Sequence, residues 1–427
     1  MKRHVVLAFV LAILAPAGTL LSQRSGAPSG PLRVFVDCNT QGCDLDFFRS
    51  EIPYIDYVRD RRDASLHVLV STLQTGSGGT EHTVTFIGLK DLAGITDTLT
   101  YIASQTSTQD DRRKGLARTL KLGLVRYLAR TSTGERLTVT YTAPTPTAAT
   151  AAAEKKKDPW NFWVFRTRVN GNFSGESSQN FVYLNGSISA NRVTKAWKIN
   201  NSSFVNYAES NFTLNEDEKF SSYSRQYGAS HLVVKSLGEH WSAGERASLT
   251  SSTYINTRRA LRFAPAVEYN LFPYSQSTRK QLTFQYSAGI NSYRYRDTTI
   301  FEKTSEVRAN QTLSASVTAT QPWGSIAGSI EGATFLDDWT KRHLVLFNSI
   351  DARLFKGFSF NMFGQLQLLR DQLYLAKGGA TQEEILLQRR QLSTSYSYFV
   401  GIGFSYTFGS IFNNVVNPRF EGANVFF

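Results

Sequence analysis

The sequence predicts a mainly β fold in which an antiparallel transmembrane β-barrel of about 12 strands follows a small α+β periplasmic domain. Three observations lead to this expectation. From Asp158 onward, apolar and small polar residues alternate with a period of two, over segments of about ten residues. The connections between these segments are alternately short and long. The chain also begins with the pattern of an export signal.

The export signal has three parts. Met1–His4 is basic, Val5–Leu14 is apolar, and Ala15-Pro16-Ala17 supplies small residues for cleavage. The apolar run is too short to span a bilayer, and a buried N-terminal core helix is the alternative interpretation. We therefore expect residues 1–17, or as far as 23, to be removed. The mature protein is expected in the bacterial outer membrane, with its N-terminal domain in the periplasm.

Composition divides the remaining chain into parts. A stretch rich in Pro, Thr, Ala and Lys predicts a linker, and all six tryptophans follow it. The expected parts are an α+β periplasmic domain at 31–142, the linker at 143–157, the outer-membrane barrel at 158–409 and a C-terminal tail at 410–427.

The α+β domain is predicted from four strand candidates and two helices. The strand candidates are Leu32–Val36, Ser65–Thr72, Glu81–Ile87 and Leu99–Ile102, with a glycine turn at 76–79 between the second and the third. Asp44–Glu51 has helical character and is stopped by Pro53. Asp110–Arg130 is the clearest helix, because leucines recur at every fourth position on one face: Leu116, Leu120, Leu124 and Leu128.

The barrel is predicted from alternation along each segment. Phe284 and Tyr286, for example, alternate with Gln285 and Ser287, which places apolar side chains toward lipid and small polar ones toward a wet lumen. A soluble β-sandwich also alternates, but its strands are usually about five to six residues long. The segments begin near Asn161, Asn180, Trp197, Tyr223, Trp241, Leu261, Gln281, Arg308, Ser325, Leu344, Phe358 and Ser397.

The connections predict the orientation. Those after even-numbered segments are short, as periplasmic turns are, and four after odd-numbered segments are longer and charged: 211–220, 294–307, 337–343 and 370–392. An aromatic girdle is expected at the periplasmic ends, from Trp160, Trp197, Trp241 and Trp323. The longest connection holds the capping-box match Thr381–Glu384, which predicts a short helix acting as a lid, a partner site or loop packing.

Charged residues at inward positions are the candidate lumen residues. Two interpretations stay open: a weakly anion-selective pore, or a salt-bridge network that fills a narrow lumen. The candidates are Arg166, Arg168, Lys198, Arg246, Arg262, Glu268, Asp351 and Arg353.

Cysteine usage and net charge narrow the chemistry further. Cys38 and Cys43 predict a disulfide, because an exported pair without neighbouring histidines makes a poor zinc site. The net charge of +13 is spread along the chain: 27 of the 47 Lys+Arg and 20 of the 34 Asp+Glu lie from Asp158 onward. This spread excludes a nucleic-acid partner and favours a basic lumen or contact with outer-membrane lipid and lipopolysaccharide.

The last segment carries a family resemblance. Gly403, Tyr406 and Phe408 form a pattern that resembles the β-signal read by the bacterial barrel-assembly machinery, which implies that machinery as a partner. The family pattern normally ends the chain, whereas residues 409–427 follow here. Over 158–427, including its Ser-Tyr-Thr-Phe-Gly ending, the chain resembles the YdiY-like uncharacterised outer-membrane β-barrels. The resemblance implies fold and location and brings no functional residues. The N-terminal half is only distantly similar to small α+β periplasmic domains, which implies a periplasmic protein partner.

Motifs for catalysis, metal binding and cofactors are absent from the sequence. There is no His-Glu-x-x-His, no Gly-x-Ser-x-Gly elbow, no phosphate-binding loop and no dinucleotide fingerprint, so we expect no cofactor and no enzyme. The glycine turn at 76–79 joins two strands instead of opening a helix, which makes it a poor phosphate site. Three functions stay open: a narrow pore or transport-associated barrel, a membrane-embedded hydrolase of lipid or peptide that uses a Ser/His pair, and a structural barrel that tethers the envelope.

Overall fold

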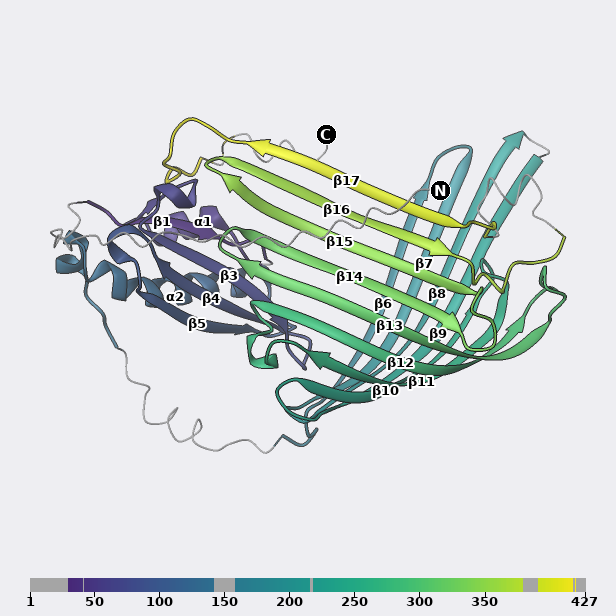
Figure 1. Ribbon diagram of the computed structural model, residues 1–427. Helices are drawn as coiled ribbons and strands as arrows, with labels where there is room; N and C mark the ends of the chain where they lie inside the picture. The colour runs from purple at the N-terminus through teal and green to yellow at the C-terminus, as the bar shows by residue number, and fades with distance from the viewer. Residues whose placement is uncertain are drawn as a thin grey trace, which may run out of the picture.

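The computed structural model describes residues 30–40, 42–141, 158–215, 218–378, 391–417 and 419. It contains the mainly β architecture expected, with a small α+β domain followed by a 12-stranded antiparallel sheet (Figure 1). Among the described helices, none is long and apolar enough to cross a membrane. The expected signal peptide, the linker at 143–157 and the helix around Thr381–Glu384 lie outside the described residues.

The N-terminal domain has a five-stranded sheet of order β2-β1-β3-β4-β5. Strand β1 is parallel to both β2 and β3, while β3, β4 and β5 are antiparallel. The elements are β1 (Arg33–Asp37), α1 (Leu45–Glu51), β2 (Asp56–Tyr57), β3 (Leu66–Gln74), β4 (Thr80–Gly88), β5 (Thr96–Ala103) and α2 (Gln109–Leu128). Each expected strand and helix of this domain is present, and the two-residue strand β2 is additional.

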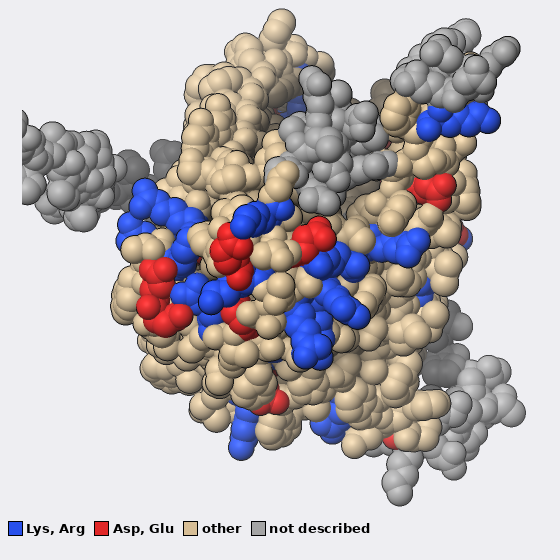
Figure 2. Space-filling model, turned by 90° about the vertical axis from the view of Figure 1, so that its right-hand side faces the viewer, with Lys and Arg blue, Asp and Glu red and all other residues tan. Residues whose placement is uncertain are grey.

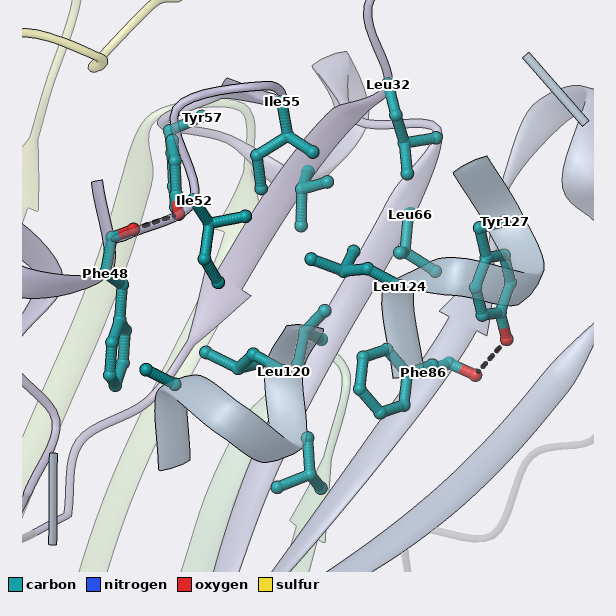
Figure 3. Packing of buried hydrophobic residues seen from close by; sticks show 14 of the residues in the cluster. Leu32, Phe48, Ile52, Ile55, Tyr57, Leu66, Phe86, Leu120, Leu124 and Tyr127 are labelled. Atoms are coloured by element: carbon teal, nitrogen blue, oxygen red, sulfur yellow. Dashed lines mark hydrogen bonds between the residues drawn. The ribbon is translucent and has the colours of Figure 1, made fainter. Parts of the chain in front are cut away.

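Helix α2 covers one face of this sheet and forms the core with it (Figure 3). The four leucines that predicted the helix are buried to 2% exposure or less. Two buried tyrosines satisfy their hydroxyl groups on main-chain oxygens: Tyr127 donates to the carbonyl of Phe86 at 3.0 Å, and Tyr57 donates to that of Phe48 at 2.8 Å. Thr108 and Asp111 form a capping box that starts α2.

The second sheet consists of consecutive antiparallel neighbours, from β6 at one edge to β17 at the other. Its strands are β6 (Trp163–Gly175), β7 (Gln179–Val193), β8 (Trp197–Asn215), β9 (Glu218–Ser236), β10 (Trp241–Ser252), β11 (Thr257–Asn270), β12 (Lys280–Tyr295), β13 (Ser305–Gln321), β14 (Gly324–Phe335), β15 (Arg342–Phe355), β16 (Phe358–Leu369) and β17 (Tyr396–Tyr406). The sheet curves strongly, so that β6–β9 face β14–β17 across its hollow side (Figure 1). In the described strands, β6 and β17 are two edges with no pairing between them.

The prediction of one long loop is wrong. Residues 211–220 were expected to form a long charged connection, but β8 and β9 are 19 residues each and remain paired through Phe212↔Phe220 and Thr213↔Lys219. Charge marks solvent exposure, and an antiparallel hairpin can continue into solvent when its side chains are polar. The other three long connections are found between paired strands, at 296–304, 336–341 and 370–395.

Candidate functional site

The two faces of the 12-stranded sheet differ in chemistry. On β12, Phe284 and Ile290 project outward and are 44% and 59% exposed, whereas Thr283 and Asn291 project into the hollow and are 7% and 3% exposed. Direct cross-strand partners share a face, so the same alternation runs around the sheet. The hollow side is therefore polar and the convex side apolar, as a strand between lipid and water requires.

Two predicted lumen residues, Arg246 and Arg262, lie in the half of the hollow that is away from the N-terminal domain. The guanidinium of Arg262 lies 3.5 Å from the hydroxyl of Thr312, and Arg262 and Arg246 interact electrostatically with Glu331. Glu331 also lies 3.5 Å from Nε2 of His343, whose Nδ1 contacts Asp371. Neither Arg246 nor Arg262 forms an ion pair with the described residues, so this cluster leaves both the pore and the salt-bridge interpretations open.

The remaining predicted lumen residues lie elsewhere. Glu268 accepts a hydrogen bond from the hydroxyl of Tyr274 at 2.7 Å, in the turn between β11 and β12. Burial and Glu268 together raise the pKa of Tyr274 to about 12. Arg168 and Lys198 are exposed, and neither forms an ion pair with the residues that the structure describes. Three residues, Arg166, Asp351 and Arg353, lie against the N-terminal domain.

One contact between the two parts joins Arg353 on β15 to Asp37 at the end of β1. Both guanidinium Nη atoms donate to the Asp37 carboxylate, at 2.6 and 2.7 Å. The ring of Phe35 lies 5.2 Å from the same guanidinium, and Nε2 of His67 lies 3.4 Å from the carboxylate. Burial alone would raise the pKa of Asp37, but hydrogen bonds from His67 and Arg353 together with the positive charge hold it below its ordinary value.

A second contact holds the turn between β15 and β16. The carboxylate of Asp60 accepts a hydrogen bond from the main-chain nitrogen of Gly357 at 2.6 Å, and Asp63 pairs with Lys356 at 2.6 Å. Gly357 has a φ of +72°, so this two-residue turn needs glycine at that position. Two acidic residues of the N-terminal domain therefore bind one turn of the large sheet.

The opposite side of the N-terminal domain reaches the first strands of the large sheet. The tip of the β3–β4 hairpin packs there, and a Cβ atom placed on Gly76 would lie only 2.5 Å from the Cβ of Val193 on β7. A Cβ on Gly78 would lie 2.1 Å from a guanidinium nitrogen of Arg166 on β6. The glycines of this turn permit close contact with β6 and β7, which gives the Gly-rich segment a structural use.

The C-terminal tail adds to the edge of the N-terminal sheet. Beyond β17, Val58 and Phe412 form an antiparallel bridge, and the main-chain nitrogen of Asn413 donates to the carbonyl of Tyr57 at 2.8 Å. In the described part of the tail, Phe412 is 46% and Val415 is 85% exposed, so neither side chain is buried beneath or inside the large sheet. Main-chain pairing to an open strand edge positions the tail instead.

A cavity of about 370 Å³ remains between the two parts. Leu69 and Ser71 of β3 line one side, and Gln321, Ser325 and Asp351 of the large sheet line the other. The face of the N-terminal sheet opposite α2 thus looks toward the hollow of the large sheet, in agreement with Figure 1. Asp351 keeps its inward orientation and lies at this interface.

The other predicted site residues have local roles. Cys38 and Cys43 form the expected disulfide, with Cα atoms 5.7 Å apart. Gly403 and Tyr406 lie on β17, with Gly403 opposite Asn361 and Tyr406 opposite Phe358, and Phe408 follows that strand with 78% exposure. Trp160, Trp197, Trp241 and Trp323 all lie at the end of the large sheet that holds the N-terminal domain, each at least 38% exposed.

Sequence reasoning missed Asp37, Asp60 and Asp63, because nothing in their spacing marks them as contacts to a segment some 300 residues away. One signal was available. Val68, Leu69 and Val70 form an uninterrupted apolar run, which is typical of a strand covered on both faces, and residues 66–71 are indeed buried at six consecutive positions. That pattern indicates a second layer on the side opposite α2.

Comparison with known proteins gives few matches. No family model and no curated protein matches the chain. Among solved structures, the NanC porin in a rhombohedral crystal form is 11% identical, covers 57% of this chain and 99% of its own, and has a TM-score of 0.27. The translocator domain of the autotransporter NalP from Neisseria meningitidis is 10% identical, covers 58% of this chain and 81% of its own, and has a TM-score of 0.19. Strand order and register define the fold of this chain, and its YdiY-like resemblance stays a prediction.

Proposed function

We propose that the chain is an outer-membrane β-barrel pore whose N-terminal domain closes its periplasmic mouth. The polar hollow and the apolar convex face of the 12-stranded sheet support a membrane-spanning, water-containing barrel. Outer-membrane lipid, lipopolysaccharide and the barrel-assembly machinery are its proposed partners.

The proposal includes closure of β6 onto β17 in the membrane. In hydrocarbon, each main-chain group that lacks a hydrogen-bond partner costs several kcal/mol, so an open edge of eleven or more residues is not sustainable. Direct partners on paired strands face the same side of a sheet, so an outward residue of β6 must lie opposite an outward residue of β17. Val169 on β6 should therefore pair with an even-numbered position on β17, such as Val400 or Ile402. Cysteines at these outward positions should cross-link in one register, while Val169→Cys with the inward Gly401→Cys should not.

One observation supports the closing role of the N-terminal domain. It contacts strands near both edges of the sheet at the same end: β6 and β7 through the β3–β4 hairpin, and β15 and the β15–β16 turn through Asp37, Asp60 and Asp63. A domain that bridges β6 and β7 to β15 and β16 at one end lies across that end of the hollow.

Conductance of the full-length protein in planar bilayers tests this function. The wild type should be mostly closed, and Arg353→Ala with Lys356→Ala should raise the open fraction, because both ion pairs that hold the domain at β15 and the β15–β16 turn are lost. Lys377→Ala is the matched control, since it removes an ion pair with Glu302 at the opposite end. Equal behaviour of the interface and control variants would contradict the closing role, and absence of any conductance in all of them would contradict the pore.

The alternative function, a membrane-embedded hydrolase, needs a histidine that can activate a serine, and the contacts of the described barrel histidines do not favour this role. Both ring nitrogens of His343 face carboxylates, those of Asp371 and Glu331, so neither is available to activate a hydroxyl nucleophile. His231 contacts Asn201 and Glu245, and His240 contacts the carbonyl of Asn270. We propose that the chain is not an enzyme. Lipid hydrolysis by the purified protein would reverse that assignment.

A further inference from the structure

A row of outward-facing residues crosses six strands near the outer end of the large sheet, the end opposite the N-terminal domain. Each member is the direct cross-strand partner of the next: Tyr286, Leu313, Gly332, Leu344, Leu368 and Tyr396. Five members carry large side chains and one carries none. Gly332 therefore leaves a notch in the row between Leu313 and Leu344.

Gly332 lies in a groove of about 820 Å³ on this face of the sheet. Tyr286 and Leu313 line one side, and Leu344, Leu368 and Tyr396 line the other. A Cβ atom on Gly332 would have only the Cδ1 atom of Leu344 near it, at 3.9 Å, so the floor of the groove is open. Its volume and its apolar lining suit a hydrocarbon chain.

The outer rim of this groove is basic. Arg342 precedes Leu344 by two residues and lies on the same face of the sheet, and Arg370 follows Leu368 by two residues. Both arginines therefore lie nearer than the two leucines to the end of the sheet that is away from the N-terminal domain. The main-chain nitrogen of Arg370 donates to the carbonyl of Arg342 at 2.9 Å, which sets the two residues side by side. Both side chains are exposed, and neither forms an ion pair with the described residues. Two adjacent like charges repel each other unless an anion lies between them.

Trp339 completes the rim, 64% exposed in the connection between β14 and β15. An exposed tryptophan above an apolar surface is typical of the membrane interface, where its ring is buried and its N–H group meets headgroups. The groove therefore has an apolar lining, with Trp339 and the two arginines at its outer rim. Figure 2 shows this end of the molecule, where Lys and Arg are prominent.

We propose that this groove binds one phosphorylated lipid of the outer leaflet, with an acyl chain along Gly332 and a phosphate on Arg342 and Arg370. The proposal rests on the membrane placement proposed above. Arginine binds phosphate through charge-assisted hydrogen bonds, and the apolar groove accounts for the chain that a free anion lacks. A neutral lipid would leave both guanidinium groups without a partner.

Native mass spectrometry of the folded, delipidated full-length protein with lipid A tests the site. The wild type should retain one lipid A molecule. Arg342→Gln with Arg370→Gln should weaken binding at least about tenfold through loss of the phosphate contacts. Gly332→Leu should have a similar effect by filling the notch, since the open space there lets the variant fold.

Two matched controls separate the groove from the rest of the surface. Arg259→Gln with Arg294→Gln removes another directly paired, outward-facing arginine couple at the same end, outside the groove lining. Gly328→Leu fills another outward glycine four residues along β14, where an added Cβ makes ordinary contacts. Both controls should bind lipid A as the wild type does, within about twofold.

Three results would overturn the proposal. They are an equal loss of lipid A binding in the control variants, equal binding of dephosphorylated lipid A by the wild type, and binding of inorganic phosphate, but not of lipid A, at the arginine pair. Folding of each variant is checked by its heat-modifiable mobility in gels. A folded, conducting barrel that binds no lipid A overturns the lipid site alone, whereas a chain that never enters membranes overturns the proposed function.

Discussion

The carboxylate of Asp37 and the guanidinium of Arg353 meet in a two-pronged ion pair, at 2.6 and 2.7 Å, although 316 residues separate them in the chain. The Asp37 side chain is 10% exposed and that of Arg353 is 29% exposed. Partial desolvation strengthens the pair, and its planar geometry fixes the orientation of the N-terminal domain on β15. Docking of that domain is therefore expected to depend on this pair more than on the exposed pair of Lys356 with Asp63.

The first prediction concerns this pair directly. Arg353→Gln should weaken docking by about 2–3 kcal/mol, because it leaves Asp37 buried with one hydrogen-bond partner fewer. Asp37→Asn should have a similar effect, and the double variant should cost much less than the sum of the two. The open probability of single channels gives the docking free energy of each. Additive effects would mean that the two side chains do not interact.

A second prediction follows from the lowered pKa of Asp37. Its pKa is below the ordinary value of 3.8 when docked, so the pair stabilises docking above that pH and loses this stabilisation as the pH falls through the lowered pKa. Channel opening should therefore increase only in acid, below about pH 4. Asp37→Asn should open at neutral pH and lack the acid response. An unchanged acid response in that variant would assign the titration to another carboxylate.

The sequence predicted the elements well where a local period decides them. Most strand starts agree with alternation, from Trp197 and Trp241 at the first residues of β8 and β10 to Phe358 at the first residue of β16. Strand β9 is the largest departure, because it begins at Glu218 and not near Tyr223. Period two follows from the geometry of a strand between two different environments, so each segment carries its own signal. Helix α2 was found for the same reason, because its leucines recur on one face.

The contacts that make the candidate site could not be predicted in this way. Arg353 was recognised as inward-facing, but its partner Asp37 lies in the other part of the chain, and no periodicity relates the two. The same holds for Asp60 with Gly357 and for Gly76 with Val193. Long-range pairing depends on how two finished surfaces fit together, which a single sequence does not encode locally.

A third prediction tests which face meets lipid. Phe284→Arg should destabilise the folded barrel by about 2–4 kcal/mol if its side chain lies near the bilayer midplane. Gln285→Arg should be nearly silent, because Gln285 faces the hollow directly opposite Glu268, which can pair with the new charge. Urea unfolding in lipid vesicles measures both. Equal tolerance of the two changes would remove the assignment of the convex face to lipid.

A fourth prediction concerns His82 in the core of the N-terminal domain. The ring is fully buried, and neither nitrogen has a hydrogen-bond partner among the described residues. Burial, with the nearby charge of Arg112, lowers its pKa below the ordinary 6.5. The unfolded chain therefore takes up a proton first as the pH falls below 6.5, and the domain loses stability there.

His82→Phe should therefore stabilise the domain by about 1 kcal/mol, since it removes buried polar atoms without partners. It should also reduce the loss of stability between pH 6.5 and 5, leaving the part due to His67, whose pKa burial likewise lowers. Hydrogen exchange of α2 amides in the full-length protein measures both effects. A variant with the wild-type pH dependence would show that His82 does not titrate in this range.

The last prediction concerns orientation. Twelve strands return the chain to the end at which it entered, and the contacts of Arg59 with the carbonyl oxygens of Phe408 and Gly409 place the tail beside the N-terminal domain at that end. The connection between β16 and β17, which includes Gly378, lies at the opposite end. If the N-terminal domain is periplasmic, protease added to intact cells should cut near Gly378 and spare both the domain and the tail. Permeabilising the outer membrane should then expose the segment between residues 141 and 158 to cleavage, which serves as the control. Cleavage before residue 158 in intact cells, with Gly378 protected, would invert the topology and place the closed mouth of the barrel at the cell surface.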